Sequence, residues 1–272
     1  MLIKNTIIKK IGGKPGKTVA VFCGVHGNEK AGVYAVTNVL KNVKIKKGVV
    51  YFVYANPEAI KRNIRMIKKN LNRCFLKDNK GKTPEDKRAR KLMKILDKCD
   101  GLLDLHASNV EKATPFVICE KQSYALAKIF DVGIVSSGWD RIEPGATDGY
   151  MNKKKGALSL GIECGYAGES EKNMQLAKKS IFQFLQFFGL MDKRVDFNKR
   201  EQKNINVTKA IKKNTDNFYF TKKWKDFDLL KKGEIIAYDS RKKHIAGKNE
   251  CIIFANASKK KGQEAFIIGK VK

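Results

Sequence analysis

Short apolar runs alternate with helix-like segments through the first two-thirds of the 272-residue chain. Residues 18–25 and 48–55 are short, apolar and rich in β-branched side chains, a pattern typical of buried strands. Residues 28–43 between them indicate a helix, and residues 100–108 and 156–165 return to the strand pattern. This alternation predicts an α/β fold with a mostly parallel, mixed sheet and helices on both faces.

Two further helices have recognisable starts. Thr83 and Pro84 precede Glu85 and Asp86, which combines a cap residue, a proline in the first turn and two acids at the positive end of a helix. Apolar side chains then recur near a spacing of 3.6 residues, so an amphipathic helix is expected to follow. Ser170 is the expected cap of a last long helix that runs through LQFFGL.

The pattern changes after residue 193. Five short strand-like pieces follow, separated by turns rich in Gly, Lys and Asn: 204–211, 217–221, 233–239, 250–256 and 264–270. We therefore expect two domains, a larger α/β domain over residues 1–193 and a small all-β C-terminal domain over residues 194–272.

Composition indicates a folded protein of the cytoplasm. Hydrophobic residues make up 42% of the chain, which is enough for a core. The six cysteines have no paired spacing and no CxxC motif, as expected for reduced thiols. The N-terminus interrupts its apolar residues with charges, and the apolar run 181–190 is too short to span a bilayer. We expect a cytoplasmic protein without a membrane partner. Composition does not define the oligomeric state, and a homo-oligomer is possible.

The formal net charge of +30 raises the alternative of nucleic-acid binding. Most of this charge is lysine spread along the whole chain, without an aromatic-and-basic motif or a zinc-finger spacing. A nucleic-acid partner is therefore not expected, whereas a positive field would attract a small anionic substrate.

Two of the three histidines lie where ligands bind in α/β sheets. His26 and His106 each end a predicted buried strand, and the carboxyl ends of parallel strands meet at one edge of the sheet. His244 lies in the C-terminal region and is expected to be structural. His26 and His106 are thus the candidates for chemistry.

The motif HGNE adds a carboxylate to this pair. A chain that turns from a strand into a helix directs His26 and Glu29 toward one point, and His106 supplies a third group from another strand. Two imidazoles and a carboxylate form an open, catalytic type of zinc site. Asp104 shares the strand face of His106 and could accept a hydrogen bond from it. Taken singly, each of these residues also has a structural explanation, so the prediction depends on their convergence.

Further charged residues suit hydrolysis. Glu163 ends an apolar run in GIECG, where a carboxylate is costly unless it is paired, hydrated or functional, and it could serve as a general base and acid. Arg65, Asn72 and Arg73 could hold an oxyanion and a carboxylate. Single arginines in so basic a chain are otherwise ordinary surface charges.

The ordered motifs resemble the aspartoacylase/succinylglutamate desuccinylase family, a branch of the zinc carboxypeptidase-like hydrolases. The motifs that resemble it are HGNE, ANP, NIRM followed by NLNRCF, DLHAS and GIECG, with FANASKKKGQEAF near the C-terminus. The resemblance implies one Zn²⁺ per chain bound by His26, Glu29 and His106, with Glu163 as general acid and base. It also implies that the β-rich tail is the family's smaller C-terminal domain.

The resemblance also implies roles in substrate binding. Arg65 would stabilise the oxyanion, and Asn72 and Arg73 would bind the carboxylate of the amino-acid part. Tyr150 and Lys153 would recognise a further carboxylate, although their spacing from the catalytic glutamate does not align cleanly. In the tail, lysines at 259–261 stand where aspartoacylases are expected to have tyrosines. This departure from the family pattern argues against specificity for N-acetylaspartate.

The expected activity is hydrolysis of the amide bond of an N-acyl amino acid. Two alternatives stay open at this point: a metallocarboxypeptidase acting on short peptides, and a basic nucleic-acid-binding protein on an inactive hydrolase fold. The sequence does not define the acyl group or the amino acid.

Overall fold

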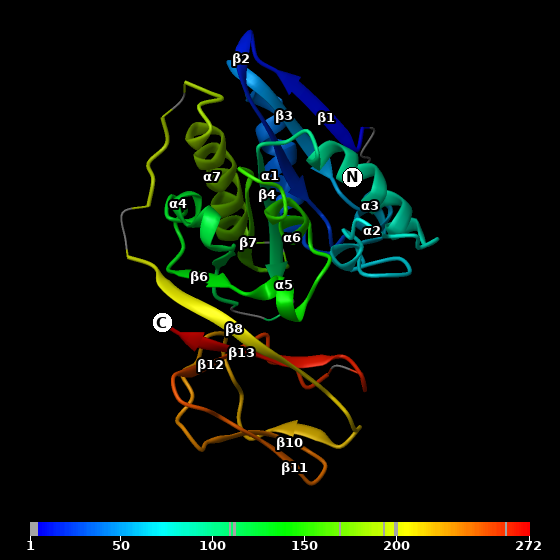
Figure 1. Cartoon of the computed structure of the whole chain (residues 1–272), viewed down its shortest axis with the longest axis vertical. Coiled ribbons are helices and arrows are strands. Elements are labelled where there is room, and N and C mark those ends of the chain that lie inside the picture. Colours follow the sequence, from blue (N-terminus) through cyan, green and yellow to red (C-terminus); the bar gives the residue numbers. More distant parts are fainter. Residues whose placement is uncertain are drawn as a thin grey trace.

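A ten-stranded mixed sheet forms the centre of the protein, seen here in a computed structural model (Figure 1). The structure describes residues 5–108, 110, 113–168, 170–192, 194–198, 201–258 and 260–272. The strand order across the sheet is β1 (Ile7–Ile11), β3 (Lys47–Tyr54), β2 (Lys14–Cys23), β4 (Gly101–Ser108), β7 (Leu158–Tyr166), β5 (Phe116–Ile118), β6 (Ile134–Ser137), β8 (Lys203–Lys212), β13 (Glu264–Val271) and β12 (Glu250–Ile253).

Parallel pairing dominates the middle of this sheet. Strands β3, β2, β4 and β7 pair in parallel, and after an antiparallel β7–β5 pair the parallel arrangement continues through β5, β6 and β8. Both ends of the sheet are antiparallel: β1 pairs with β3 at one end, and at the other β8 pairs with β13, which pairs with β12. The predicted mostly parallel, mixed sheet is confirmed.

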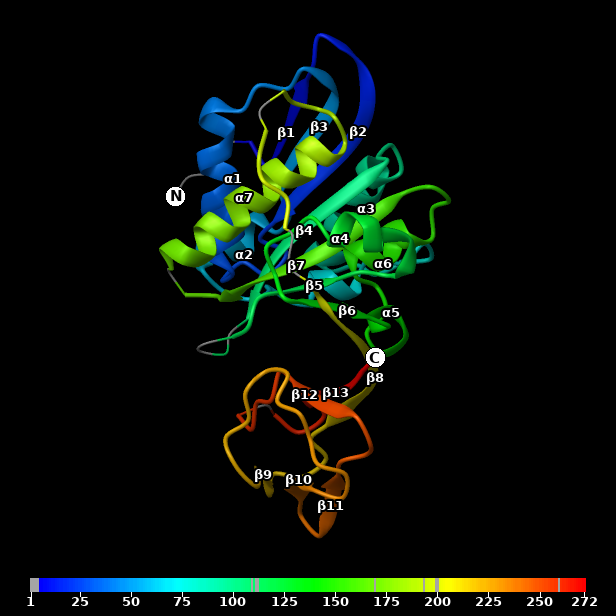
Figure 2. The ribbon, with the colours of Figure 1, turned by 90° about the vertical axis from the view of Figure 1, so that its left-hand side faces the viewer.

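Helices cover both faces of the sheet (Figure 2). Helices α1 (Lys30–Asn42) and α7 (Glu171–Phe187) pack on the face that carries Val19 and Val21 of β2. Helix α3 (Pro84–Leu96) packs on the opposite face, against Ala20 and Phe22. Successive side chains of a strand point to opposite faces, so the buried, apolar run over residues 19–23 of β2 fits a sheet covered on both sides.

The two predicted helix starts are present. The Thr83 side chain accepts from the backbone of Asp86, and the Asp86 carboxylate accepts from the backbone of Thr83, which completes a capping box at α3. Ser170 accepts from the backbone N–H of Asn173 at the start of α7.

Short helices and turns connect the larger elements, and the sequence pattern did not predict them. They are α2 (Pro57–Arg62), α4 (Tyr124–Ala127), α5 (Trp139–Ile142), α6 (Thr147–Asn152) and the 3₁₀ turns η1 (Leu71–Arg73) and η2 (Lys121–Ser123). One or two turns are too short to show a helical period. Several of these pieces nevertheless position the site described below.

The C-terminal region is β-rich, as expected, and part of it extends the main sheet. Strand β8 pairs with β6, and β13 and β12 follow it, while β9 (Phe218–Phe220), β10 (Ile235–Asp239) and β11 (Lys242–Ile245) form a separate antiparallel sheet. Residue 193, at the predicted boundary, lies outside the described residues. The division into two domains stays a prediction, because the backbone hydrogen bonding continues from β6 into β8.

The cysteines and the helices give two further findings. All six cysteines are buried and free, with no disulfide among them. Among the described residues, none of the helices has the length and apolar character needed to cross a membrane.

Candidate functional site

The turn between β2 and α1 is built against α2. Gly27 lies so close to this helix that an added Cβ would be 2.1 Å from the carbonyl carbon of Ala59. Its backbone N–H donates to the carbonyl of Arg65 at 3.3 Å, and Gly24 has a φ of +64° that favours glycine. The two glycines, one on each side of His26, therefore let the chain turn sharply between β2 and α1.

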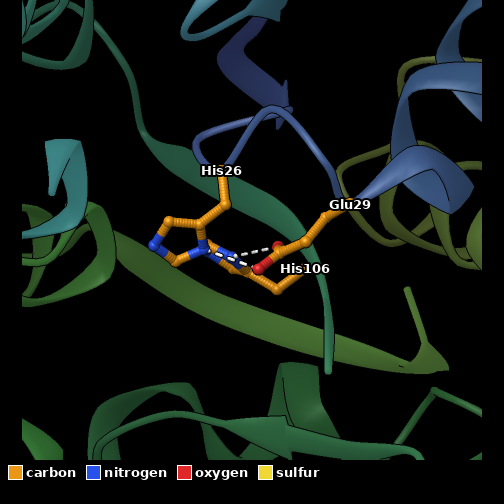
Figure 3. A group of neighbouring side chains, drawn as sticks. All are labelled: His26, Glu29 and His106. Atoms are coloured by element: carbon orange, nitrogen blue, oxygen red, sulfur yellow. Dashed lines mark hydrogen bonds and ion pairs between the residues drawn. The ribbon is translucent and has the colours of Figure 1, made fainter. Parts of the chain in front are cut away.

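Glu29 is the N-cap residue of α1, but its side chain makes no capping hydrogen bond. Its carboxylate instead lies between two imidazoles, with Oε1 2.6 Å from Nδ1 of His26 and Oε2 3.1 Å from Nδ1 of His106 (Figure 3). The backbone N–H of Ala107 also donates to Oε2. The structure thus brings His26, Glu29 and His106 together at one buried point, as the sequence predicted.

The register of β4 and β7 places the other predicted groups. Asp104 and His106 share one face of β4, and their partners across the parallel pair are Gly161 and Glu163 of β7. Paired residues of neighbouring strands point to the same side of the sheet. Glu163 therefore lies beside His106 at the carboxyl ends of the strands.

The outer nitrogens of both imidazoles are also engaged. Nε2 of His106 lies 3.1 Å from Oδ2 of Asp104, which also accepts from the hydroxyl of Thr147. Nε2 of His26 lies 3.0 Å from Oδ1 of Asn70. With a metal ion at the shared point, a proton held on each Nε2 would leave the lone pair of each Nδ1 for the ion, an arrangement common among metal-binding histidines.

Asn70 is a site residue that the sequence reasoning missed. Its Oδ1 also accepts from the backbone N–H of Asn72, which holds Asn70 at the start of η1. Its local signal was its place as the first residue of the motif NLNRCF, directly before the LNR turn. Its contact with His26 depends on two segments separated by 44 residues.

The cluster has the donors and the electrostatics of a cation site. The ligand atoms of His26, Glu29 and His106 lie within 4.8 Å of one another, and all three residues are buried. Burial raises the pKa of Glu29, but attraction to His26 and hydrogen bonds from both imidazoles outweigh it and lower that pKa below its ordinary value. Burial lowers the pKa of His106, but Asp104 and Glu29 outweigh it and raise that pKa well above its ordinary value. The residues present therefore fit a metal ion with a preference for nitrogen and oxygen ligands.

Glu163 lies next to this cluster as a half-buried residue with a buried carboxylate oxygen. This oxygen, Oε2, has no hydrogen-bond partner in the part of the chain that the structure describes. Burial and the nearby Glu29 raise the pKa of Glu163 to about 8, close to the range in which one group can both take up and release a proton.

A cavity of about 380 Å³ opens over the cluster, and three more predicted residues line it. Nη1 of Arg65 lies 3.3 Å from Oε1 of Glu29. Arg73 donates from Nη1 to the carbonyl of Asn72 at 2.7 Å and forms an ion pair with Glu143. Oδ1 of Asn72 accepts from the backbone N–H of Thr147 at 3.1 Å.

Tyr150 and Lys153 are not among the described residues that line the cavity. The Tyr150 hydroxyl donates to Oδ1 of Asp97 at 2.6 Å, and Nζ of Lys153 lies 3.8 Å from Oδ2 of Asp140. Tyr150 comes two residues after the cavity-lining Asp148 on α6, so it points about 200° away around the helix axis.

Lys260, Lys261 and His244 are not among the described residues that line the cavity, although the backbone N–H of Lys260 donates to the lining residue Gln263 at 3.0 Å. Lys260 and Lys261 are exposed, and Lys259 lies outside the described residues. The His244 ring packs at 5.7 Å from that of Phe266 and at 6.2 Å from that of Phe218, in the small C-terminal sheet region.

An outer wall of the cavity was not predicted. We use this term for the lining residues Trp139, Glu143, Asp148, Phe254, Gln263 and Glu264. They come from three separate segments that the tertiary fold brings together. Phe254, Gln263 and Glu264 lie in the motif FANASKKKGQEAF, but no motif marks the other three residues. Burial and the nearby Asp104 raise the pKa of Asp148 to about 6.

Comparison with known proteins agrees with this geometry. Residues 15–188 match the succinylglutamate desuccinylase/aspartoacylase catalytic domain. A succinylglutamate desuccinylase of Shewanella sp. strain W3-18-1 is 27% identical over 277 aligned positions, which cover 89% of this chain and 79% of that protein. The crystal structure of a succinylglutamate desuccinylase from Vibrio cholerae superposes with a TM-score of 0.81 at 20% identity, over 98% of this chain and 85% of that one. The matched domain spans more than half of the chain and includes the three residues of the candidate metal site, His26, Glu29 and His106. The chain therefore belongs to the succinylglutamate desuccinylase/aspartoacylase family.

Proposed function

We propose that this protein is a zinc-dependent hydrolase that cleaves the amide bond of an N-acyl amino acid to give a carboxylate and a free amino acid. The observation that supports it most is the convergence of His26 and His106 on the Glu29 carboxylate, with Glu163 beside them. Relatives that carry the name succinylglutamate desuccinylase support the same class of reaction.

One zinc ion per chain would be held by His26, Glu29 and His106. Zinc, when bound, polarises a carbonyl and lowers the pKa of water. Asp104 and Asn70 would hold the two imidazoles in the orientation that keeps each Nδ1 free of its proton.

Glu163 is the proposed general base and acid. In its ionised form the carboxylate takes a proton from the attacking water, and it then delivers that proton to the nitrogen of the departing amine. Oε2 of Glu163 has no partner among the described residues, so a water molecule or the substrate nitrogen can occupy its hydrogen-bonding position.

Arg65 is the proposed oxyanion donor. Its guanidinium borders the cavity with a side chain 38% exposed, and it touches Glu29 by one nitrogen only, so other N–H groups can turn toward the developing negative charge. Loss of one such donor costs about 3–4 kcal/mol in comparable sites.

Asn72 and Arg73 are the proposed binding groups for the carboxylate of the amino-acid part. Both line the cavity, and the guanidinium of Arg73 has the donor geometry that a carboxylate requires. A carboxypeptidase would use the same pair for the C-terminus of a peptide, so peptides belong in the test.

The test is an activity screen of the zinc-loaded protein over N-acetyl, N-succinyl and N-formyl amino acids together with dipeptides. We expect turnover of an N-acyl amino acid, and loss of roughly 10³-fold or more of it in Glu163→Gln. Glu58→Gln is the matched control, because the exposed Glu58 pairs with Arg62 outside the cavity. Hydrolysis of dipeptides alone would favour the carboxypeptidase alternative. No amide hydrolysis, with steeply salt-dependent DNA binding, would favour the nucleic-acid alternative.

A further inference from the structure

Carboxylates dominate the charged lining of the cavity, although the whole chain has a net charge of +30. Its acidic lining residues are Glu29, Glu143, Asp148, Glu163 and Glu264. Its basic lining residues are Arg65 and Arg73, and no lysine is among the described residues that line it. Carboxylates therefore outnumber basic side chains in this lining, whereas basic residues outnumber acidic ones in the chain as a whole.

Both arginines already have carboxylate partners. Arg65 pairs with Glu29 at 3.3 Å, and Arg73 pairs with Glu143. The proposed reaction uses Arg65 for the oxyanion and Arg73 for one substrate carboxylate. Among the described lining residues, no cation is left for a second carboxylate of the substrate.

The backbone holds Glu143 beside Arg73. Gly145, two residues later, packs so closely on the 3₁₀ turn that an added Cβ would lie 2.8 Å from the carbonyl carbon of Arg73. The backbone N–H of Phe75 donates to the carbonyl of Gly145 at 3.0 Å. The segment that carries Glu143 is thus fixed to the segment that carries Arg73.

The position of Asp148 is fixed in a similar way. The preceding Thr147 donates its backbone N–H to Asn72 and its hydroxyl to Asp104. The hydroxyl of Ser159 donates to the carbonyl of Asp148 at 3.0 Å. Two carboxylates that the proposed reaction does not use, Glu143 directly after α5 and Asp148 in α6, therefore line the cavity on fixed segments.

We infer that the enzyme selects an N-acyl amino acid with a basic side chain and an uncharged acyl group, and that Glu143 and Asp148 determine this specificity. This inference rests on the proposed function. An ammonium group in the cavity would pair with these carboxylates where water is partly excluded. A second carboxylate would instead face them without a free cation, and like charges in contact are strongly unfavourable.

The test compares kcat/KM of the zinc-loaded, full-length protein for three substrates that share the acetyl group. These are Nα-acetyl-L-ornithine, neutral N-acetyl-L-norvaline and acidic N-acetyl-L-glutamate, with N-succinyl-L-glutamate as a fourth, more anionic substrate. We expect kcat/KM for the ornithine derivative to exceed that for norvaline by about tenfold and those for both glutamate derivatives by about 100-fold.

Two variants then test whether Glu143 and Asp148 determine the substrate preference. Glu143→Gln and Asp148→Asn should each lower the ornithine-to-norvaline ratio by roughly fivefold to tenfold, because each removes one partner of the ammonium group. Glu143→Gln should also raise the relative rate on N-acetyl-L-glutamate, since it frees Arg73 from its carboxylate partner. The control Glu234→Gln removes a carboxylate that pairs with Lys222 outside the cavity and should leave every ratio unchanged.

Two results would overturn the inference while leaving the proposed function in place. One is a wild-type preference for either glutamate derivative, and the other is equal kcat/KM for ornithine and norvaline. Both are measured on the unmodified protein and do not depend on a variant that folds. Failure to hydrolyse any N-acyl amino acid would instead overturn the proposed function itself.

Discussion

The two ends of the cavity are built in different ways. The inner end, with His26, Glu29 and His106, lies at the carboxyl ends of neighbouring parallel strands, and hydrogen bonds fix its groups on several sides. The outer wall is assembled from short helices and from the C-terminal strands. The contrast suggests that the inner end supplies the reaction and the outer wall supplies the choice of substrate.

The largest expected effect breaks the inner end. Glu29→Gln keeps the shape of the side chain but removes the negative charge that both imidazoles contact. Zinc content measured by atomic absorption should fall from one per chain to a small fraction of it, and kcat/KM should fall by roughly 10³-fold or more. Glu58→Gln, on an exposed helix surface, should change neither value. A Glu29→Gln protein that retains full zinc and activity would contradict the assignment.

The next effect concerns stability and pH. The folded-state pKa of Glu163 is raised to about 8, above the value of about 4.3 for an unfolded chain. A carboxyl with a raised folded pKa favours the folded state in its protonated form. Its ionisation therefore destabilises the protein progressively as the pH rises from about 4.3 to about 8.

Glu163→Gln removes this titration. In metal-free protein, the variant should be more stable than the wild type by about 2–4 kcal/mol at pH 8, and the difference should vanish near pH 4.5. Urea unfolding at the two pH values measures it. A difference that does not change with pH would show that the Glu163 carboxyl is not buried beside the cluster.

A smaller effect separates the two imidazole supports within the inner end. Asp104→Asn and Asn70→Ala should each weaken zinc affinity by about 10–100-fold, because they remove the groups that orient His106 and His26. Asp104→Asn should have the larger effect, since hydrogen bonds to a charged acceptor are the stronger ones. Competition with a zinc chelator gives both affinities, and equal affinity to the wild type in both variants would contradict the proposed supports.

The smallest expected effect lies outside both ends of the cavity. Tyr150→Phe removes only the hydroxyl that donates to Asp97, so kcat/KM should stay within about twofold of the wild type on every substrate. A large and substrate-dependent change would restore the role in substrate recognition that the family resemblance implied for Tyr150.

The inner end could be predicted because each of its residues has a local signal. HGNE follows a buried strand, DLH ends another, and parallel strands present their carboxyl ends at one edge, so His26 and His106 were expected to meet. The alternation along β4 likewise predicted that Asp104 lies on the face of His106, where the structure places it.

The arrangement of the outer wall could not be predicted, because its residues meet only through long-range packing. The Arg73–Glu143 ion pair joins two segments that are too short to show a helical or strand periodicity in the sequence. The β6–β8 pairing, which brings the C-terminal strands to the cavity, depends on an edge of the sheet that exists only in the folded chain. Tyr150 was assigned from spacing in a motif, but the rotation of the short helix α6 directs it toward Asp97.

The most direct test of the metal site is anomalous diffraction at the zinc absorption edge from crystals of the zinc-loaded protein. The account predicts one strong anomalous peak per chain, in contact with Nδ1 of His26, Nδ1 of His106 and the carboxylate of Glu29. A fully loaded crystal with no peak among these three side chains, or with its only peak elsewhere, would contradict it.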